Sequence, residues 1–216
     1  MTWPSSSHLR HFAFLYALVT AEFVVVFWGG DWITAQHSVR IHAYWNFELS
    51  IPLVPVMVVP YMTMYVIFVL APFILRTTDE LDRLAAALSR VILIGGIGFI
   101  AIPAQLGFPT ATAGGSIWGP WLHLADQLNL DYDLIPSLHV ALFTVCAGAY
   151  APRVRVVART LLGAWLAVVT ASTILTHQHQ LIDVVAGLAL GAWGAIHATS
   201  RSAAHRTNRK TSPCSP

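Results

Sequence analysis

The chain consists largely of long apolar stretches that contain almost no charged side chains. Soluble domains carry about 25% charged residues, whereas only 10% of these 216 residues are charged. So few charges cannot cover a surface that faces water. A helix of about 20 apolar residues crosses a bilayer and satisfies its own backbone hydrogen bonds. The sequence therefore predicts an all-α integral membrane protein with no sizeable soluble domain.

Six stretches are long and apolar enough for transmembrane helices, and we expect them to form a single bundle. They are residues 12–28, 51–75, 84–104, 134–150, 156–176 and 180–199. Pro52, Pro55 and Pro60 are expected to bend the second stretch. Gly187 and Gly191 form a G-x-x-x-G pair, which favours close packing of the last helix on a neighbour. The first stretch is too long for the core of a typical signal peptide, so we expect it to remain as an anchor.

The basic residues indicate which side of the membrane each connection faces. Eleven of the twelve Lys and Arg residues fall on one side of a six-span arrangement, and only Arg40 falls on the other. By the positive-inside rule the basic side is cytoplasmic, and both termini lie on it. We therefore expect cytoplasmic tails at 1–11 and 200–216, around a membrane domain at 12–199 in the plasma or inner membrane. The connections expected outside are residues 29–50, 105–133 and 177–180.

Two histidines far apart in the sequence are predicted to lie at one depth on the outer face. His139 begins the fourth stretch and His179 begins the sixth, and both stretches enter the membrane from outside. Asp183 follows His179 by four residues, so the two side chains share one helix face. A carboxylate in an apolar helix needs a partner, and it would fix the tautomer of the imidazole. The pattern predicts a two-histidine site with a supporting aspartate.

The motifs around these residues resemble those of a known membrane enzyme family. PSLH at 136–139, and HQLIDVVAG at 179–187 one hairpin later, resemble the type 2 phosphatidic acid phosphatase superfamily. YWNFELSIPLVPVMVVPYMTMYVIFVLAPF, DYDLIPSLHVALF and STILTHQHQLIDVVAG are similar to the branch with the inositol phosphorylceramide synthases, which are sphingolipid enzymes. The resemblance covers residues 44–195. It implies a six-helix membrane core that hydrolyses or transfers phosphate esters of lipids without a metal or other cofactor.

The resemblance also implies a role for each matching residue. His179 would be the nucleophile that forms a phosphohistidine, and Asp183 would orient it. His139 would protonate the leaving alcohol and then activate water or an acceptor alcohol. Ser137 would bind phosphate at the start of its helix, where backbone amides suit an anion.

The chain departs from the hydrolytic members at the residues that would bind phosphate charge. Those members have a first motif with Lys and Arg-Pro, and an Arg six residues before the nucleophile, where this chain has Thr173. Arg40, the only basic side chain expected outside, and His177 are the candidates for this task. A phosphodiester carries less charge than a phosphomonoester, so the pattern favours transfer or cleavage of a lipid head group. The acceptor, water or an alcohol, stays open.

Two other interpretations remain. His177, His179 and Asp183, with His139, are side chains that can bind zinc, although no HExxH motif is present. A non-catalytic lipid carrier or assembly subunit on the same scaffold would explain the missing basic residues. The sequence has no aromatic-rich basic patch of the kind that binds nucleic acid. The expected partner is a lipid phosphate or phospholipid.

Overall fold

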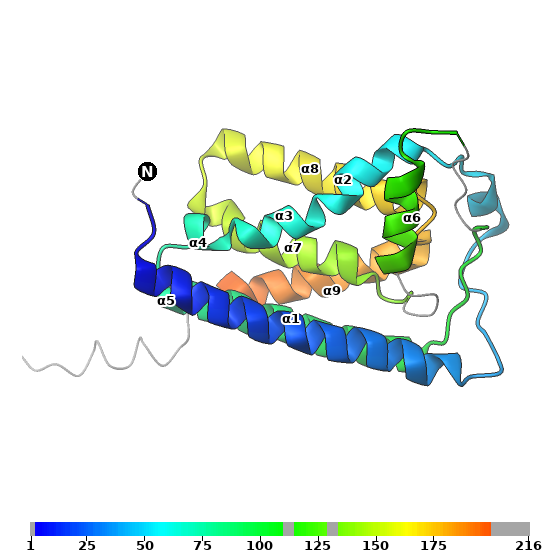
Figure 1. The fold of residues 1–216 in the computed structure, drawn as a ribbon, viewed down its shortest axis with the longest axis horizontal. Helices are drawn as coiled ribbons and strands as arrows, with labels where there is room; N and C mark the ends of the chain where they lie inside the picture. The colour runs from blue at the N-terminus through cyan, green and yellow to red at the C-terminus, as the bar shows by residue number, and fades with distance from the viewer. Residues whose placement is uncertain (1–2, 110–114, 129–133, 200–216) are drawn as a thin grey trace, which may run out of the picture.

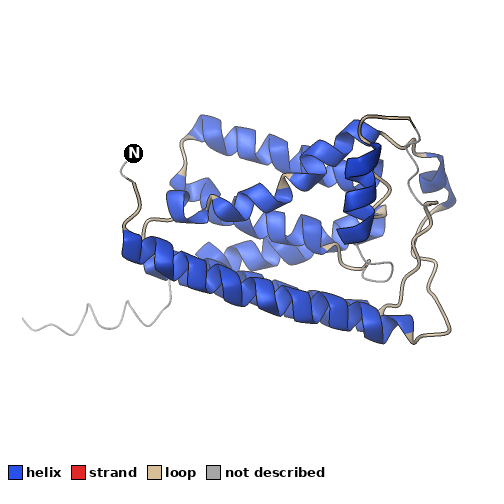
Figure 2. Ribbon diagram, in the orientation of Figure 1, coloured by secondary structure: helices blue, strands red, loops and turns tan. Residues whose placement is uncertain are grey.

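The computed structural model of the protein describes residues 3–109, 115–128 and 134–199, and its named elements there are all helices (Figures 1 and 2). Four of them are long and apolar enough to cross a membrane. These are α1 (Ser6–Ala35), α5 (Thr78–Ala101), α8 (Val156–Leu175) and α9 (Leu181–Thr199). The expected basic tail at 200–216 lies outside the described residues.

The other two predicted spans are not continuous membrane-length helices, so the six-span prediction is confirmed only in part. The stretch 51–75 is divided into η2 (Pro55–Met57), α2 (Val58–Met62), α3 (Met64–Val69) and α4 (Ala71–Ile74). Pro55 and Pro72 lie in the first turns of η2 and α4, since proline lacks the N–H that would continue a preceding helix. The stretch 134–150 becomes helical only at α7 (Leu138–Tyr150), which is 13 residues long.

Three shorter helices complete the described chain: η1 (Asn46–Ser50), α6 (Gly119–Leu128) and η3 (Ala151–Arg153). Figure 1 places α6 at the end of the bundle opposite the N-terminus. At the N-terminal end, α1 begins at Ser6, within the segment expected to be a tail. Ser5 caps it by accepting a hydrogen bond from the backbone N–H of His8, at 3.3 Å.

Helix α7 is the central element of the bundle, and 11 of its 13 residues are buried. Helix α9 approaches it through the predicted glycine pair. A Cβ at Gly187 would lie 2.5 Å from the carbonyl oxygen of Ser137, and one at Gly191 would lie 2.5 Å from that of Ala141. Real Cβ atoms do not come so close to a backbone oxygen, so glycine is required at both positions. The predicted close packing of the last helix is therefore present.

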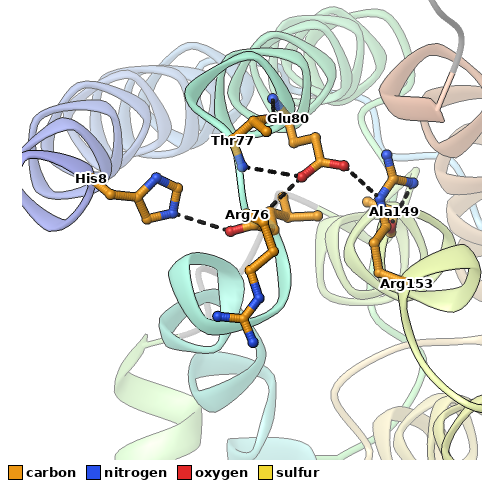
Figure 3. Close-up of polar contacts among 7 residues, drawn as sticks. His8, Arg76, Thr77, Glu80, Ala149 and Arg153 are labelled. Carbon is orange, nitrogen blue, oxygen red and sulfur yellow. Dashed lines mark hydrogen bonds and ion pairs between the residues drawn. The ribbon is translucent and has the colours of Figure 1, made fainter. Parts of the chain in front are cut away.

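A polar cluster connects α1, α5 and α7 at the end where the N-terminus lies (Figure 3). Thr77 and Glu80 form a capping box at the start of α5. Arg153, after α7, places its Nε 3.1 Å from a carboxylate oxygen of Glu80. The ring Nε2 of His8 donates to the carbonyl oxygen of Leu75 at 3.1 Å. The basic residues predict this end to be the cytoplasmic one.

Replacing Gly191 with alanine is expected to destabilise the contact between α7 and α9. The added methyl group collides with backbone, and overpacking of this kind costs about 1–3 kcal/mol. Gly163→Ala on α8 is the matched control, because a Cβ there meets nothing within 4 Å. Thermal unfolding in detergent should show a lower midpoint for Gly191→Ala alone. Equal midpoints for the two variants would mean that close packing at Gly191 does not limit stability.

Candidate active site

His139 and His179 lie side by side where α7 and α9 begin. His139 is the second residue of α7, and His179 comes two residues before α9. Their ring centroids are 6.0 Å apart, and both side chains are almost fully buried. The structure thus brings together two histidines that are 40 residues apart. One lies at the start of α7, and the other lies in the turn between α8 and α9.

Asp183 lies beside His179, in the first turn of α9. Its Oδ2 is 3.5 Å from His179 Nδ1, which is within ion-pair range but longer than a good hydrogen bond. The same oxygen accepts a hydrogen bond from the backbone N–H of Gln180 at 2.9 Å. Asp183 therefore contacts His179 on its Nδ1 side and leaves the Nε2 side available for a ligand.

The turn between α8 and α9 fixes the position of His179. The carbonyl oxygen of Thr173 accepts hydrogen bonds from the backbone N–H groups of Gln178 and His179, both at 3.0 Å. His177 has a φ of 59°, a left-handed conformation that is uncommon outside glycine. This reversal returns the chain into α9. It is supported by the N–H of His177, which donates to the carbonyl oxygen of Ile174 at 2.9 Å.

Ser137 connects the starts of the two helices. Its hydroxyl caps α7 by accepting from the backbone N–H of Val140 at 3.4 Å. Its own N–H donates to the carbonyl oxygen of Asp183 at 3.0 Å. This bond, together with the contact at Gly187, sets the level of His139 relative to that of His179.

Several buried polar atoms at the site have no hydrogen-bond partner within the described residues. They are His139 Nε2, His179 Nδ1 and Nε2, Asp183 Oδ1, and both amide atoms of Gln180. Buried polar groups are nearly always paired, and leaving one unpaired costs about 1–3 kcal/mol. A group of them gathered around two histidines is the arrangement expected of a site that receives a polar ligand.

Two tyrosines of the broken second span surround His139. The ring of Tyr61, in α2, stacks on His139 with centroids 4.5 Å apart and an angle of 22°. The ring of Tyr65, in α3, meets His139 edge-on at 6.5 Å. Tyr61 is buried and Tyr65 is partly exposed. The broken segment thus forms one wall of the site and fixes the plane of the His139 ring.

Glu48, in η1, is a further carboxylate beside the start of α9, and it is fully buried. Its Oε2 accepts a hydrogen bond from the backbone N–H of Leu181 at 2.8 Å, and its Oε1 accepts from that of Trp45 at 2.9 Å. A carboxylate at a helix N-terminus satisfies orphan amides and interacts favourably with the helix dipole. Glu48 therefore holds the first residue of α9, two positions after His179.

The other predicted binding residues are His177 and Arg40. The ring of His177 stacks on Phe108 with centroids 4.2 Å apart, and its Nε2 donates to the carbonyl oxygen of Ile51 at 3.0 Å. Arg40 is half-buried in the segment between α1 and η1, next to Ile41, which forms a backbone bridge with Ala104. The structure gives His177 contacts that explain its burial without a ligand.

A zinc site needs several ligand side chains arranged around one point. Among the described residues, no group of three or more His, Cys, Asp or Glu side chains is arranged to hold a metal ion. His177, one of the four residues of the zinc interpretation, has its ring stacked on Phe108. The described residues therefore do not form the set of ligands that this interpretation needs.

Comparison with known proteins gives the family. A family model described as the PAP2 superfamily matches residues 42–197, which is more than half of the chain. The chain belongs to the PAP2 superfamily. No significant match was found among curated proteins or among solved structures. Members of this superfamily are generally phosphatases and phosphotransferases, and the apolar helices fit a membrane protein. His139, His179 and Asp183 lie within the matched region, and α1 lies before it.

Sequence reasoning did not single out Glu48, Gln180 or the two tyrosines as parts of the site of this PAP2 protein. Glu48 carried one usable signal, since it is a carboxylate close to the start of the predicted second span and such residues are seldom unpaired. Gln180 and the two tyrosines carried none, because polar and aromatic residues are common near membrane interfaces.

Replacing Glu48 with glutamine is expected to lower stability by about 1–3 kcal/mol, because an amide has one acceptor oxygen and one buried N–H would lose its partner. The matched control is Glu22→Gln, since Glu22 accepts one hydrogen bond within the described part of the chain, from Ser89 Oγ at 2.8 Å. Thermal unfolding of both variants in detergent measures the difference. A Glu48→Gln variant as stable as Glu22→Gln would contradict the double-acceptor role.

Proposed function

We propose that this PAP2 protein hydrolyses or transfers a phosphate ester of a lipid through a phosphohistidine at His179. The observation that carries the proposal is the buried pair of histidines with ring centroids 6.0 Å apart and Asp183 beside one of them. The Nε2 atoms of both rings have no hydrogen-bond partner among the described residues. Membership of the PAP2 superfamily supports the class of reaction.

In the first step, His179 attacks the phosphorus atom. Because Nδ1 faces Asp183, the attacking atom is Nε2. The bond between phosphorus and the alcohol oxygen breaks, and the protonated His139 gives its Nε2 proton to that oxygen. Asp183 stabilises the positive charge that develops on the His179 ring. The lipid alcohol leaves, and the phosphoryl group remains on His179.

In the second step, an acceptor oxygen replaces His179. His139, now neutral, removes a proton from water or from an acceptor alcohol, whose oxygen attacks phosphorus while the phosphorus–nitrogen bond breaks. His139 regains its proton, and the free imidazole of His179 is restored. Water gives hydrolysis, and an alcohol gives transfer. The chemistry of the two histidines is the same for both.

The side chains around the two histidines favour a substrate of low charge. Tyr61, Tyr65 and Gln180 are neutral, and Asp183 is acidic. Glu48 adds a second buried carboxylate nearby. A phosphomonoester dianion would be repelled by these carboxylates more strongly than a phosphodiester monoanion. Head-group transfer, as in the inositol phosphorylceramide synthases that the sequence resembles, is therefore our second candidate. Arg40, Ser137 and the amides that begin α7 are the proposed phosphate-binding groups.

We place this site at the outer face of the membrane, with both termini in the cytoplasm. The basis is the distribution of basic residues, because eleven of the twelve follow the positive-inside rule for that orientation. A six-span bundle, in which α2–α4 and α7 serve as the second and fourth spans, agrees with this proposal.

His179→Ala is expected to reduce turnover of a lipid phosphate to the uncatalysed level, because the variant has no nucleophile. His139→Ala should lower kcat by more than about 100-fold, since general acid–base catalysis is lost. His197→Ala is the matched control, because His197 lies in the last turn of α9, away from the site. Released phosphate measures the rates. Full activity of either site variant would contradict the mechanism, and a folded wild type that turns over no lipid phosphate would favour a non-catalytic carrier.

A comparison of substrates separates hydrolysis from transfer. We expect the purified protein to turn over a phosphodiester lipid faster than the matching phosphomonoester, because the site is rich in carboxylates. Each substrate is supplied with and without ceramide or diacylglycerol. Free phosphate, released head-group phosphate and new head-grouped lipid are measured together, because hydrolysis of a phosphodiester yields a phosphomonoester. A preference for the phosphomonoester, with phosphate as the only product, would exclude the transferase.

A further inference from the structure

We propose that the cleft between α1, α3 and α5 binds one hydrocarbon chain of the lipid substrate. This inference rests on the proposed function and adds a second part to the same site. The cleft holds about 150 Å³ of free space and is partly open to the outside.

The chemistry of the cleft selects a hydrocarbon. Six residues of α1 line it, and α5 contributes Leu81, Leu84, Ala85, Leu88 and Ile92. Apart from Thr20 and two tyrosines, the described side chains that line it are apolar, and none is charged. Such a surface offers an apolar chain favourable contacts along its whole length but offers a charged head group no charged partner.

The cleft adjoins the candidate active site. Tyr65 lines the cleft, and the edge of its ring also meets the ring of His139. Leu142, which lies three residues after His139 on the same face of α7, lines the cleft as well. A lipid whose phosphate lies between His139 and His179 would therefore direct its chain past Tyr65 into this space.

The length of the cleft matches one leaflet of a membrane. Its α1 wall extends from Phe12 to Phe23, and at 1.5 Å per residue this is about 16 Å. Half of a hydrocarbon core of about 30 Å is nearly the same length. A chain bound with its head group at the histidines would thus have an apolar wall about as long as one leaflet to lie against.

Helix α1 lies before the region that matches the PAP2 superfamily, at 42–197. One wall of the cleft is therefore supplied by a segment that precedes the matched region, while His139 and His179 lie within it. We infer that α1 determines which chain lengths this protein accepts, separately from the chemistry of the two histidines.

Photocrosslinking tests the proposal without turnover. The probe is a lipid phosphate with a diazirine near the methyl end of its chain, added to protein in phosphatidylcholine nanodiscs. We expect labelling of α1 and α5 peptides that line the cleft, and competition by unlabelled lipid phosphate but not by extra phosphatidylcholine. His179→Ala should be labelled equally. Labelling spread over all lipid-facing helices, or displaced equally by phosphatidylcholine, would overturn the proposal.

A pair of variants adds a control. Ala85→Phe fills the cleft, whereas Ala164→Phe adds the same ring to the exposed face of α8. Ala85→Phe should reduce specific labelling, and kcat/KM for long-chain substrates, by about tenfold, and should spare short-chain substrates. Ala164→Phe should do neither. Equal behaviour of the two folded variants would overturn the proposed role of the cleft but would leave the histidine mechanism intact. Cleft labelling without turnover of any lipid phosphate refutes the mechanism alone.

Discussion

The close contact between the starts of α7 and α9 is the constraint on which the site depends. Gly187 lets the backbone of α9 reach the carbonyl oxygen of Ser137, and the N–H of Ser137 donates to the carbonyl oxygen of Asp183 at 3.0 Å. Because His139 and His179 belong to these two helix starts, the same contact fixes the distance between their rings. A displacement of one helix by a single turn would move the histidines about 5.4 Å apart along the axis.

Around this contact, the polar groups fall into two kinds. Those that position the backbone form hydrogen bonds. Glu48 accepts one from the N–H of Leu181, and Asp183 Oδ2 accepts one from the N–H of Gln180. The Nε2 atoms of the two histidines and Oδ1 of Asp183 lack partners among the described residues. A buried site with this division is preorganised, because its supporting hydrogen bonds are formed before a ligand arrives. The apolar cleft beside Tyr65 gives the same site a place for the rest of a lipid.

The sequence was sufficient to predict a helical membrane protein, the pairing of His139 with His179, and the close packing at Gly187 and Gly191. Each of these depends on a local pattern or on the distribution of charge. The breaks in the second span were predicted only as bends, because proline marks a weak point without fixing how the chain continues. Glu48 was missed because its partner, Leu181, is 133 residues away and is bound through the backbone, which leaves no trace in side-chain patterns.

The central claim is that the phosphoryl group passes through His179, and the most direct test is to find it there. Purified protein would be mixed with a lipid phosphate, quenched in alkali, in which phosphohistidine survives, and digested for mass spectrometry. The account predicts a phosphoryl group on His179 that disappears after acid treatment and is absent from His179→Ala. Turnover of the substrate with His179 unmodified, or with the phosphoryl group on another residue, would contradict it.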